Sequence, residues 1–282
     1  MKILVTGSSG HAGLAIAQLL QQEGHAVLGL DQREGPLTHL QGDLNDWTLL
    51  KKAVKQVDAI IHTASLHAPH VPSHSREQFI QTNVQATLHL LELAKTFRLK
   101  RLVYTSTTSL YGHALESDHQ AVWVTEEVPP QPRDIYDISK LTAEQLCQDF
   151  YRSEGLSCIC LRVSRFWNEP LPDRLWYRMY RGLALSDVAA AHQLALMKEE
   201  IGYGLYNISA QSPFVPEELT QLKFDPLPLV RIKLPGLLDY FADQNWPLPS
   251  SIDRVYVIEK AKRELGFNPL VNAQAYLDQL NT

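Results

Sequence analysis

Three glycines separate an apolar run from a helical pattern near the start of the chain. The stretch reads LVTGSSGHAGLA, and its glycines are Gly7, Gly10 and Gly13. Glycine weakens regular structure, so its repeated use here needs a physical reason. Gly7 permits a tight turn, Gly10 lets a phosphate approach the backbone, and Gly13 lets the helix pack closely on the strand. The pattern predicts the phosphate-binding turn of a dinucleotide site.

The first 165 residues alternate between strand-like and helical patterns. Short aliphatic and β-branched runs typical of strands lie at residues 2–5, 26–30, 59–62, 102–105 and 157–162. Such alternation is typical of a parallel sheet with helices on both faces. We therefore predict an α/β fold, a doubly wound Rossmann sheet. The 282 residues, 45% of them hydrophobic, suffice for a large core.

Prolines interrupt this alternation after residue 165. Helical patterns remain only near residues 187–199, 258–265 and 273–280. We expect a Rossmann domain over residues 1–165, and we expect the helices at 187–199 and 258–265 to pack back onto it. The rest of residues 166–282 is expected to form a small, irregular substrate-binding part.

Composition restricts the class of protein. The net charge is −5 and the basic residues are scattered, which argues against a nucleic-acid partner. The chain enters a strand at once, and no apolar run approaches the roughly 18 residues of a membrane helix. We expect a soluble cytoplasmic protein with no membrane partner. Cys158 and Cys160 share one face of a strand and Cys147 lies in a helical stretch, so we interpret them as reduced core thiols rather than a redox or metal pair.

An acidic residue ends the second strand-like run. Asp31 comes about 20 residues after the glycines, where a carboxylate accepts hydrogen bonds from a ribose. A carboxylate repels an additional 2′-phosphate, so Asp31 favours NAD over NADP. Arg33 keeps NADP open, because arginine binds phosphate with two hydrogen bonds. The alternative for Asp31 is a turn residue at a strand end.

Tyr136 and Lys140 are four residues apart at the start of a helical run, in YDISK. This spacing places both side chains on one face of a helix. A free tyrosine has a pKa of about 10, and a neighbouring positive charge, from Lys140 or a nicotinium ring, lowers that value. Tyr136 is therefore a candidate general base. The hydroxyl cluster TSTTS ends the strand at 102–105, where the sites of such sheets lie.

The helical stretch at residues 77–97 carries apolar residues on more than one side. A helix that touches only its own sheet needs a narrower apolar stripe. We therefore expect a homodimer, in which this helix and the helix at residues 136–151 pair with their symmetry mates.

Several motifs, in this order, resemble the extended short-chain dehydrogenases/reductases of the NAD-dependent epimerase/dehydratase family, such as UDP-glucose 4-epimerases. TGSSGHAG resembles the family's TGxxGxxG, GDL at 42–44 its adenine-contacting segment, and HTAS at 62–65 its HxAA loop. NVQATLHLLELA is similar to the central helix, LVYTSTTSLYG to (F/L)VYxSSxxVYG, and YDISK to YGxSK. The resemblance covers residues 1 to about 165 in register and the remainder in patches.

Carried over position by position, the resemblance implies residues for hydride transfer to NAD. Thr107 would bind the substrate oxygen, Tyr136 would remove its proton, and Lys140 would hold the cofactor ribose and depress the pKa of Tyr136. Ser106 is the alternative hydroxyl if the register shifts by one. The implied cofactor-binding residues are Gly7, Ser9, Gly10, His11, Ala12, Gly13, Asp31, Gln32, Asp43, Leu44, Thr63, Ala64, Ser65, Asn83, Tyr136 and Lys140.

The chain departs from the family pattern after residue 165. LRVSRFWNEP has Arg165 where the family has asparagine, and the segment before ALSDVA, which commonly contributes to the nucleotide pocket, is short. A compact substrate part resembles instead that of the uronate dehydrogenases, which oxidise a free sugar acid. In that interpretation Arg165, Arg174 or Arg178 binds a carboxylate, and the alternative for each is an ion pair or a solvated position.

Three histidines in LHAPHVPSH fall outside the family pattern: His67, His70 and His74. A metal site would need their imidazoles to converge with a further ligand. We expect no metal and assign this loop to the substrate or to the surface. The expected substrate contacts are His67, Ser106, Thr107, Arg165 and Arg174.

Two functions from different classes remain open. The first is an NAD-dependent oxidoreductase or epimerase acting on a sugar or nucleotide sugar, with a uronate-type dehydrogenase as its variant. The second is a cofactor-binding sensor that turns nothing over. The presence of Thr107, Tyr136 and Lys140 together favours the enzyme.

Overall fold

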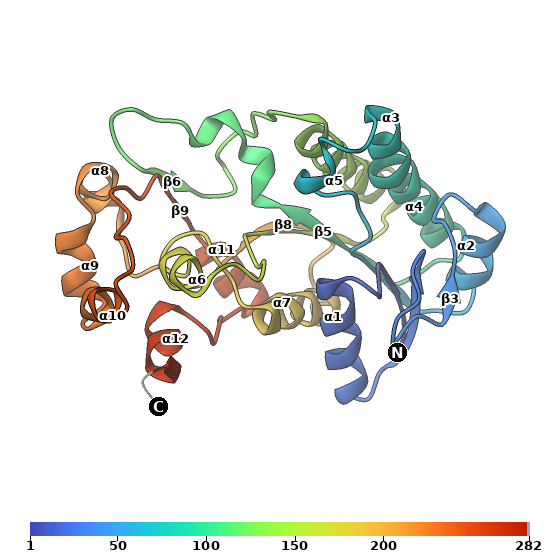
Figure 1. The fold of residues 1–282 in the computed structure, drawn as a ribbon. Helices are drawn as coiled ribbons and strands as arrows, with labels where there is room; N and C mark the ends of the chain where they lie inside the picture. Colours follow the sequence, from blue (N-terminus) through green and yellow to red (C-terminus); the bar gives the residue numbers. More distant parts are fainter. Residues whose placement is uncertain (281–282) are drawn as a thin grey trace.

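A seven-stranded parallel sheet forms the centre of the protein (Figure 1). The computed structural model describes residues 1–280. The strands run in the order β3-β2-β1-β4-β5-β7-β8, and every neighbouring pair is parallel. Their bounds are β1 Lys2–Thr6, β2 Ala26–Asp31, β3 Leu40–Gln41, β4 Ala59–His62, β5 Arg101–Thr107, β7 Cys158–Val163 and β8 Tyr203–Ile208.

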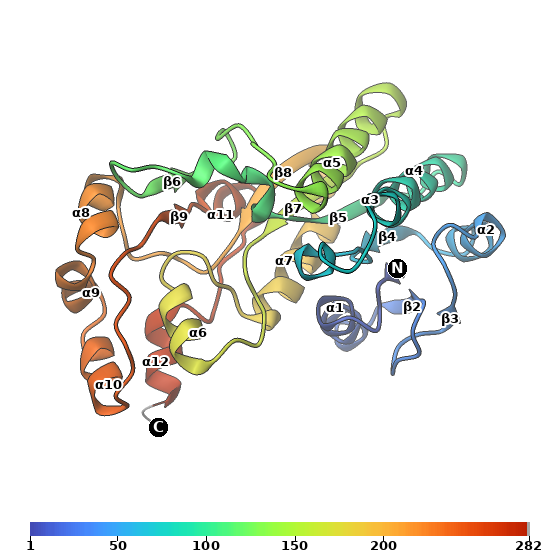
Figure 2. The ribbon, with the colours of Figure 1, turned by 45° about the horizontal axis from the view of Figure 1, so that its top comes forward.

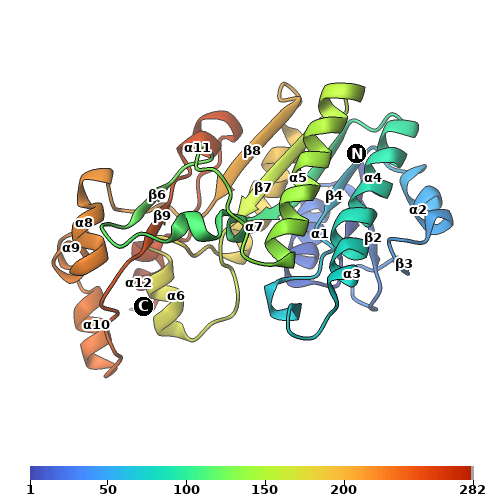
Figure 3. The same cartoon turned by 90° about the horizontal axis from the view of Figure 1, so that it is seen from above.

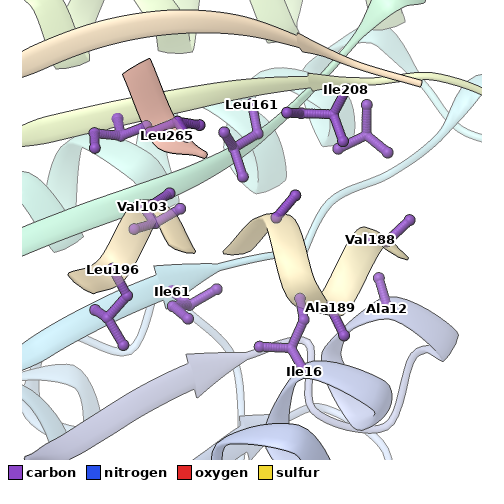
Figure 4. Close-up of a cluster of buried hydrophobic side chains, with 14 of the residues drawn as sticks. Ala12, Ile16, Ile61, Val103, Leu161, Val188, Ala189, Leu196, Ile208 and Leu265 are labelled. Carbon is purple, nitrogen blue, oxygen red and sulfur yellow. The ribbon is translucent and has the colours of Figure 1, made fainter. Parts of the chain in front are cut away.

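Helices cover both faces of this sheet, because alternate strand residues point to opposite sides. Val103 packs on one side and Leu102 on the other, and both are fully buried. Burying one such side chain contributes about 1.5–3 kcal/mol. One face carries α1 (His11–Gln22), α7 (Leu185–Met197) and α11 (Glu259–Leu265), and the other carries α2 (Trp47–Val54), α4 (Ala86–Thr96) and α5 (Ile135–Glu154). Figure 4 shows Ile16 of α1 next to Ala189 of α7, on the face of the sheet that these helices cover. The predicted doubly wound α/β fold is confirmed.

The segment expected as one helix at 77–97 consists of α3 (Arg76–Phe79), a π-helical turn (Ile80–Gln85) and α4. Figure 3 shows α4 and α5 side by side across the sheet. Leu90, Leu91 and Leu93 of α4 are buried within the single chain, between the sheet, α2 and α5. Neighbouring helices cover these three leucines, so they do not by themselves require a partner subunit, whereas Ile80 of the same segment is exposed. The homodimer stays a prediction.

The C-terminal part contains more regular structure than its sequence pattern predicts. Strand β6 (Val122–Val124) pairs in parallel with β9 (Arg254–Tyr256). A separate buried cluster, to one side of the main sheet (Figure 2), unites α6 (Leu171–Tyr177), α8 (Leu219–Phe224), α9 (Leu227–Lys233), α10 (Leu237–Asp243) and α12 (Ala273–Leu280). The sequence pattern predicted α12 but none of the other four helices of this cluster. It also predicted α7 and α11, which pack on the main sheet.

Prolines caused this error, since they begin helices here rather than interrupt them. Pro170 precedes α6 and Pro226 precedes α9, and each helix has a further proline in its first turn. The first turn tolerates proline because its N–H groups have no partner within the helix. The strand β8 was also missed, and it joins the main sheet from inside the part expected to bind substrate. The domain division at residue 165 stays a prediction.

Two further expectations concern the interior and the membrane. Cys147, Cys158 and Cys160 are free and buried in one cluster beneath α5. Within residues 1–280, no helix is long and apolar enough to cross a membrane.

Candidate active site

A cavity of about 900 Å³ opens where the main sheet's strands end. The crevice at the carboxyl ends of parallel strands, beside the point where strand order reverses between β1 and β4, is the usual ligand site of such sheets. The cavity continues from the glycine-rich turn to the substrate side of β7 and β9. Its lining includes nearly every residue expected at the site: Gly7, Ser9, Gly10, His11, Ala12, Gly13, Asp31, Gln32, Asp43, Leu44, Thr63, Ala64, Ser65, His67, Ser106, Thr107, Tyr136, Lys140 and Arg165.

The glycine-rich turn has the geometry that its spacing predicts. Gly7 adopts φ +72°, a conformation that side chains rarely allow. A Cβ on Gly13 would lie 2.1 Å from the carbonyl oxygen of Gly7, so only glycine permits this approach of α1 to the turn. The first turn of α1 holds no acidic residue, and its N–H groups face the cavity end that needs to hold phosphate. The residues present fit a dinucleotide.

Two carboxylates, those of Asp31 and Asp43, lie near the glycine-rich turn. The Asp31 carboxylate accepts hydrogen bonds from the backbone N–H groups of Ser9 (3.0 Å) and Arg33 (2.9 Å), which fixes it beside the turn. Asp43 accepts a 3.1 Å hydrogen bond from the Gln32 amide. The Arg33 side chain is 72% exposed and its Nε lies 3.8 Å from Asp31. Two carboxylates close to this end oppose the negative charge of an additional phosphate.

Tyr136 and Lys140 lie on successive turns of α5, facing the end of β5. The helix begins at a cap, in which Asp134 accepts a 3.0 Å hydrogen bond from the N–H of Asp137. The Lys140 ammonium donates a 2.5 Å hydrogen bond to the carbonyl oxygen of Thr105 and sits 4.4 Å from the centre of the Tyr104 ring. Thr107 ends β5, its hydroxyl accepts a 3.1 Å hydrogen bond from the Ser109 N–H, and it lies close enough to Tyr136 to lower the pKa of that tyrosine. The helix spacing and the end of β5 thus bring the three predicted catalytic residues together.

Burial dominates the charge state of this group. It raises the pKa of Tyr136 to about 12, although the nearby Thr107 lowers it. Burial also lowers the pKa of Lys140 to about 7, against the favourable charge of Glu144. Because Lys140 is only partly charged near neutral pH, it does little to lower the tyrosine pKa that burial has raised. The pKa-lowering effect expected from Lys140 therefore needs a second positive charge in the cavity.

A buried ion pair beneath the site distinguishes Thr107 from its neighbour Ser106. Glu144 accepts two hydrogen bonds from Arg162, from Nη2 at 2.7 Å and from Nε at 3.0 Å, and both side chains are 3% exposed. Ser106 donates a 2.5 Å hydrogen bond to the same carboxylate, and Arg162 also donates to Tyr111 at 3.1 Å. Ser106 is thus engaged in the interior, which leaves Thr107 as the hydroxyl beside Tyr136.

Asn83 does not line the cavity, contrary to its expected cofactor contact. It is buried in the π-helical turn, and its amide pairs with both backbone groups of Leu66, at 2.8 and 3.0 Å, and with Ser139 at 2.9 Å. All of its hydrogen-bonding atoms are thereby used within the protein. Asn83 fixes the loop after β4 instead of reaching a ligand.

The arginines near the substrate end are only partly those that were expected. Arg165 lines the cavity but is ion-paired with Glu169. Arg174 does not line it, because α6 directs this side chain towards α12, where it lies 5.8 Å from the ring of Tyr276. Arg178 lies against the same ring at 5.5 Å. The structure thus places Arg174 outside the cavity, and its substrate contact stays a prediction.

Three cavity arginines were missed. Arg181 lies 4.6 Å from the centre of the Tyr177 ring, and Arg254, the first residue of β9, is ion-paired with Asp253. Arg133, paired with Asp137, also reaches the wall. No local motif marks Arg254, since it reaches the site only through the pairing of β9 with β6.

The three histidines of the loop after β4 all line the cavity. The rings of His67 and His70 are 5.9 Å apart, and those of His70 and His74 are 5.1 Å apart. In the part of the chain that the structure describes, no group of three or more His, Cys, Asp or Glu side chains is placed to hold a metal ion. The loop belongs to the cavity wall rather than to the outer surface.

Comparison with known proteins agrees with this arrangement. The model of the NAD dependent epimerase/dehydratase family matches residues 3–185. The chain belongs to this family. This is the family that the motifs predicted, and it is a family of NAD-dependent enzymes.

Curated proteins and solved structures resemble the chain over different lengths. The UDP-glucose 4-epimerase of Corynebacterium glutamicum is 24% identical over 318 aligned positions, which cover 95% of this chain and 91% of that protein. The chain spans only 40%, 49% and 62% of the length of three other curated relatives. MoeE5 in complex with UDP-glucose and NAD shares the fold with a TM-score of 0.72 at 22% identity, over 100% of this chain and 99% of that one. A mutated uronate dehydrogenase gives 0.70 at 18% identity, over 99% and 85%.

Proposed function

We propose that this family member oxidises a secondary or hemiacetal hydroxyl of a sugar or sugar derivative by hydride transfer to NAD. The observation that carries the proposal is the group formed by Thr107, Tyr136 and Lys140 in one cavity with the glycine-rich turn. A base, a hydroxyl that orients the substrate and a cation stand within one continuous space. Such a group moves a proton while the neighbouring carbon gives up its hydride.

The turn around Gly10 and the N-terminus of α1 would hold the diphosphate of NAD, and Asp31 would accept hydrogen bonds from its ribose. NAD bound by these residues would supply the hydride acceptor and a positive charge within the cavity. Lys140 uses one hydrogen bond on Thr105, so its remaining N–H groups are available to a ribose hydroxyl.

The proton steps follow from the contacts of the three residues. Thr107 orients the reacting hydroxyl, and Tyr136 accepts its proton once positive charge in the cavity offsets the effect of burial on the tyrosine pKa. Because of this charge dependence, Tyr136 would first release its own proton to solvent in the open cavity, and the phenolate would then accept the proton of the substrate hydroxyl. Proton transfer before the cofactor is in place is thereby disfavoured.

The substrate end favours a ligand with an anionic group. Arg181 lines that end without an ion pair to any of residues 1–280, and Arg254 lies beside it, paired with Asp253. Arginine binds carboxylate or phosphate with two parallel hydrogen bonds. A uronate supplies a carboxylate and a nucleotide sugar supplies a diphosphate. Both the sugar epimerase and the uronate-type dehydrogenase therefore remain candidate activities on the same hydride chemistry.

A substrate screen tests the proposal. Free hexoses, uronic acids, UDP-glucose and UDP-glucuronic acid are incubated with NAD, while NADH is followed at 340 nm and the sugars are separated by chromatography. Stoichiometric NADH indicates a dehydrogenase, and a changed sugar without net NADH indicates an epimerase. The Tyr136→Phe variant should lose at least about a hundredfold in turnover while it keeps its NAD affinity, because it lacks the acid/base hydroxyl. Near-normal turnover of this variant would contradict the mechanism.

We also infer a homodimer, on a basis different from the buried stripe of α4. Ile80 of the π-helical turn is 42% exposed and Ile138 of α5 is 47% exposed, and these two segments are in contact. Exposed aliphatic side chains on adjacent helices favour self-association.

A further inference from the structure

His67 stands between the candidate base and the opposite wall of the cavity. Its ring centre is 6.2 Å from that of Tyr136 and 6.0 Å from that of Trp167, edge to face in both cases. Trp167 comes from the loop after β7, whereas His67 comes from the loop after β4. The half-buried imidazole therefore faces the space in which a substrate of Tyr136 has to sit.

Hydrogen bonds of neighbouring residues fix the orientation of the His67 ring. Its Nδ1 lies 3.3 Å from the Ser65 hydroxyl, and the His67 backbone N–H donates a 2.8 Å hydrogen bond to Nδ1 of His70. Asn83 clamps the preceding residue, Leu66, through both of its backbone groups. The Nε2 of His67 makes no hydrogen bond with any of residues 1–280. One nitrogen of a positioned ring is thus left for a ligand.

The imidazole is neutral at physiological pH. Burial, followed by the charges of Lys140 and His70, lowers the pKa of His67 to about 4. A neutral imidazole can donate or accept one hydrogen bond at Nε2, and it adds no positive charge beside Lys140. This property suits an uncharged hydroxyl rather than a carboxylate or phosphate, which the arginines at the other end suit better.

We propose that Nε2 of His67 binds the hydroxyl on the carbon adjacent to the one that is oxidised, so that the cavity selects vicinal diols. Tyr136 takes the proton of the reacting hydroxyl. The His67 imidazole, next to Tyr136, would then form a hydrogen bond with the hydroxyl on the adjacent carbon. The identity of the reacting hydroxyl rests on the proposed function. A site built to hydrogen-bond a hydroxyl rejects the analogue that lacks it, because its own polar atom is then left unpaired.

Calorimetry with NADH present tests this selection without oxidation of the probe. The probes are glucose with 2-deoxyglucose, for reaction at carbon 1, and UDP-glucose with its 3-deoxy counterpart, for reaction at carbon 4. The wild-type protein should bind the diol at least about tenfold more tightly than its deoxy partner in one pair, the equivalent of one hydrogen bond. In His67→Phe that ratio should fall close to one. The proposal is overturned if the wild type shows no such ratio for either pair, or if His67→Phe keeps it.

Matched variants separate this role from a general effect on the loop. Glutamine places its amide near the Nε2 position and asparagine near Nδ1, so His67→Gln should retain part of the ratio and His67→Asn should lose it. These two variants decide the matter if His67→Phe does not fold. Ser73→Ala, at an exposed position of the same loop outside the cavity lining, should keep the full ratio, and its loss there would overturn the proposal. Thermal melting and NADH affinity report the integrity of each variant.

Turnover, measured separately, distinguishes the two proposals. A diol preference that depends on His67, without hydride transfer from any probe, contradicts the proposed function and supports the binding role of His67. Turnover without a ratio that depends on His67 overturns only the binding role.

Discussion

Replacement of Glu144 by glutamine should destabilise the protein strongly. The glutamine keeps the shape of the side chain but leaves the Arg162 guanidinium, 3% exposed, without a counter-charge. Removal of one partner from a buried ion pair costs about 3–5 kcal/mol. A protein of this size loses about 2–4 °C in Tm for each kcal/mol, so we expect a decrease of roughly 10 °C.

The double variant Glu144→Leu/Arg162→Met should recover most of this loss. Replacing both charges by apolar side chains is often neutral, and the remaining loss comes from Ser106, which has its hydrogen bond to Glu144. Tyr111 keeps its 2.7 Å hydrogen bond to Asn207, so it is not left unpaired. We expect a net cost of about 1–2 kcal/mol, one neutral hydrogen bond or two.

Urea unfolding followed by circular dichroism, in a cycle with the single variants Glu144→Leu and Arg162→Met, measures these quantities. The cycle should give a favourable coupling energy of at least about 2 kcal/mol between the two residues. If Glu144→Gln unfolds within about 1 kcal/mol of the wild type, or if the two single losses simply add, then the pair is not electrostatically coupled in the way its burial implies.

Three further outcomes follow from the structure. Asp31→Gly should narrow the preference for NAD over NADP, because it removes the carboxylate that opposes a 2′-phosphate; calorimetry with both cofactors measures it, and an equal preference in the wild type would contradict the reasoning. Acid should destabilise the protein between about pH 6.5 and 4: burial lowers the pKa of His192 to about 4, so the unfolded chain binds a proton there that the folded chain does not. Urea unfolding at pH 5 should therefore show a loss of about 2 kcal/mol relative to pH 7 from this residue, which His192→Asn should abolish, and an unchanged slope in the variant would count against the assignment. Ile138→Glu should convert a dimer into a monomer in sedimentation velocity, whereas a wild-type monomer at micromolar concentration would refute self-association through α5.

Local sequence signals predicted the cofactor half of the molecule well. The turn at Gly7 and the pair Tyr136 and Lys140 are each encoded within a few residues, where backbone conformation and helical spacing decide the geometry. Asn83 shows the limit of such reasoning. Its position on the central helix was predicted, but its partner, the backbone of Leu66, depends on how a loop folds against a π-helical turn.

The substrate half depends on contacts between distant segments, and here the sequence pattern misled. Prolines mark the starts of α6 and α9, but without knowledge of the packing they read as interruptions. Arg174 and Arg181 are seven residues apart, yet one faces α12 and the other the cavity. Helical spacing alone does not decide between them, because α6 ends between the two residues.

The pairing of β6 with β9 divides the assembly of the site into two stages. All seven strands of the main sheet precede residue 209, whereas Arg254 reaches the cavity only when β9 lies beside β6. In the order of the chain, all strands of the main sheet therefore come before the segment that supplies this wall of the cavity. Substitutions around β9 can alter this wall without touching Thr107, Tyr136 or Lys140. The wall that His67 supplies has no such independence, because it belongs to a loop of the main sheet itself.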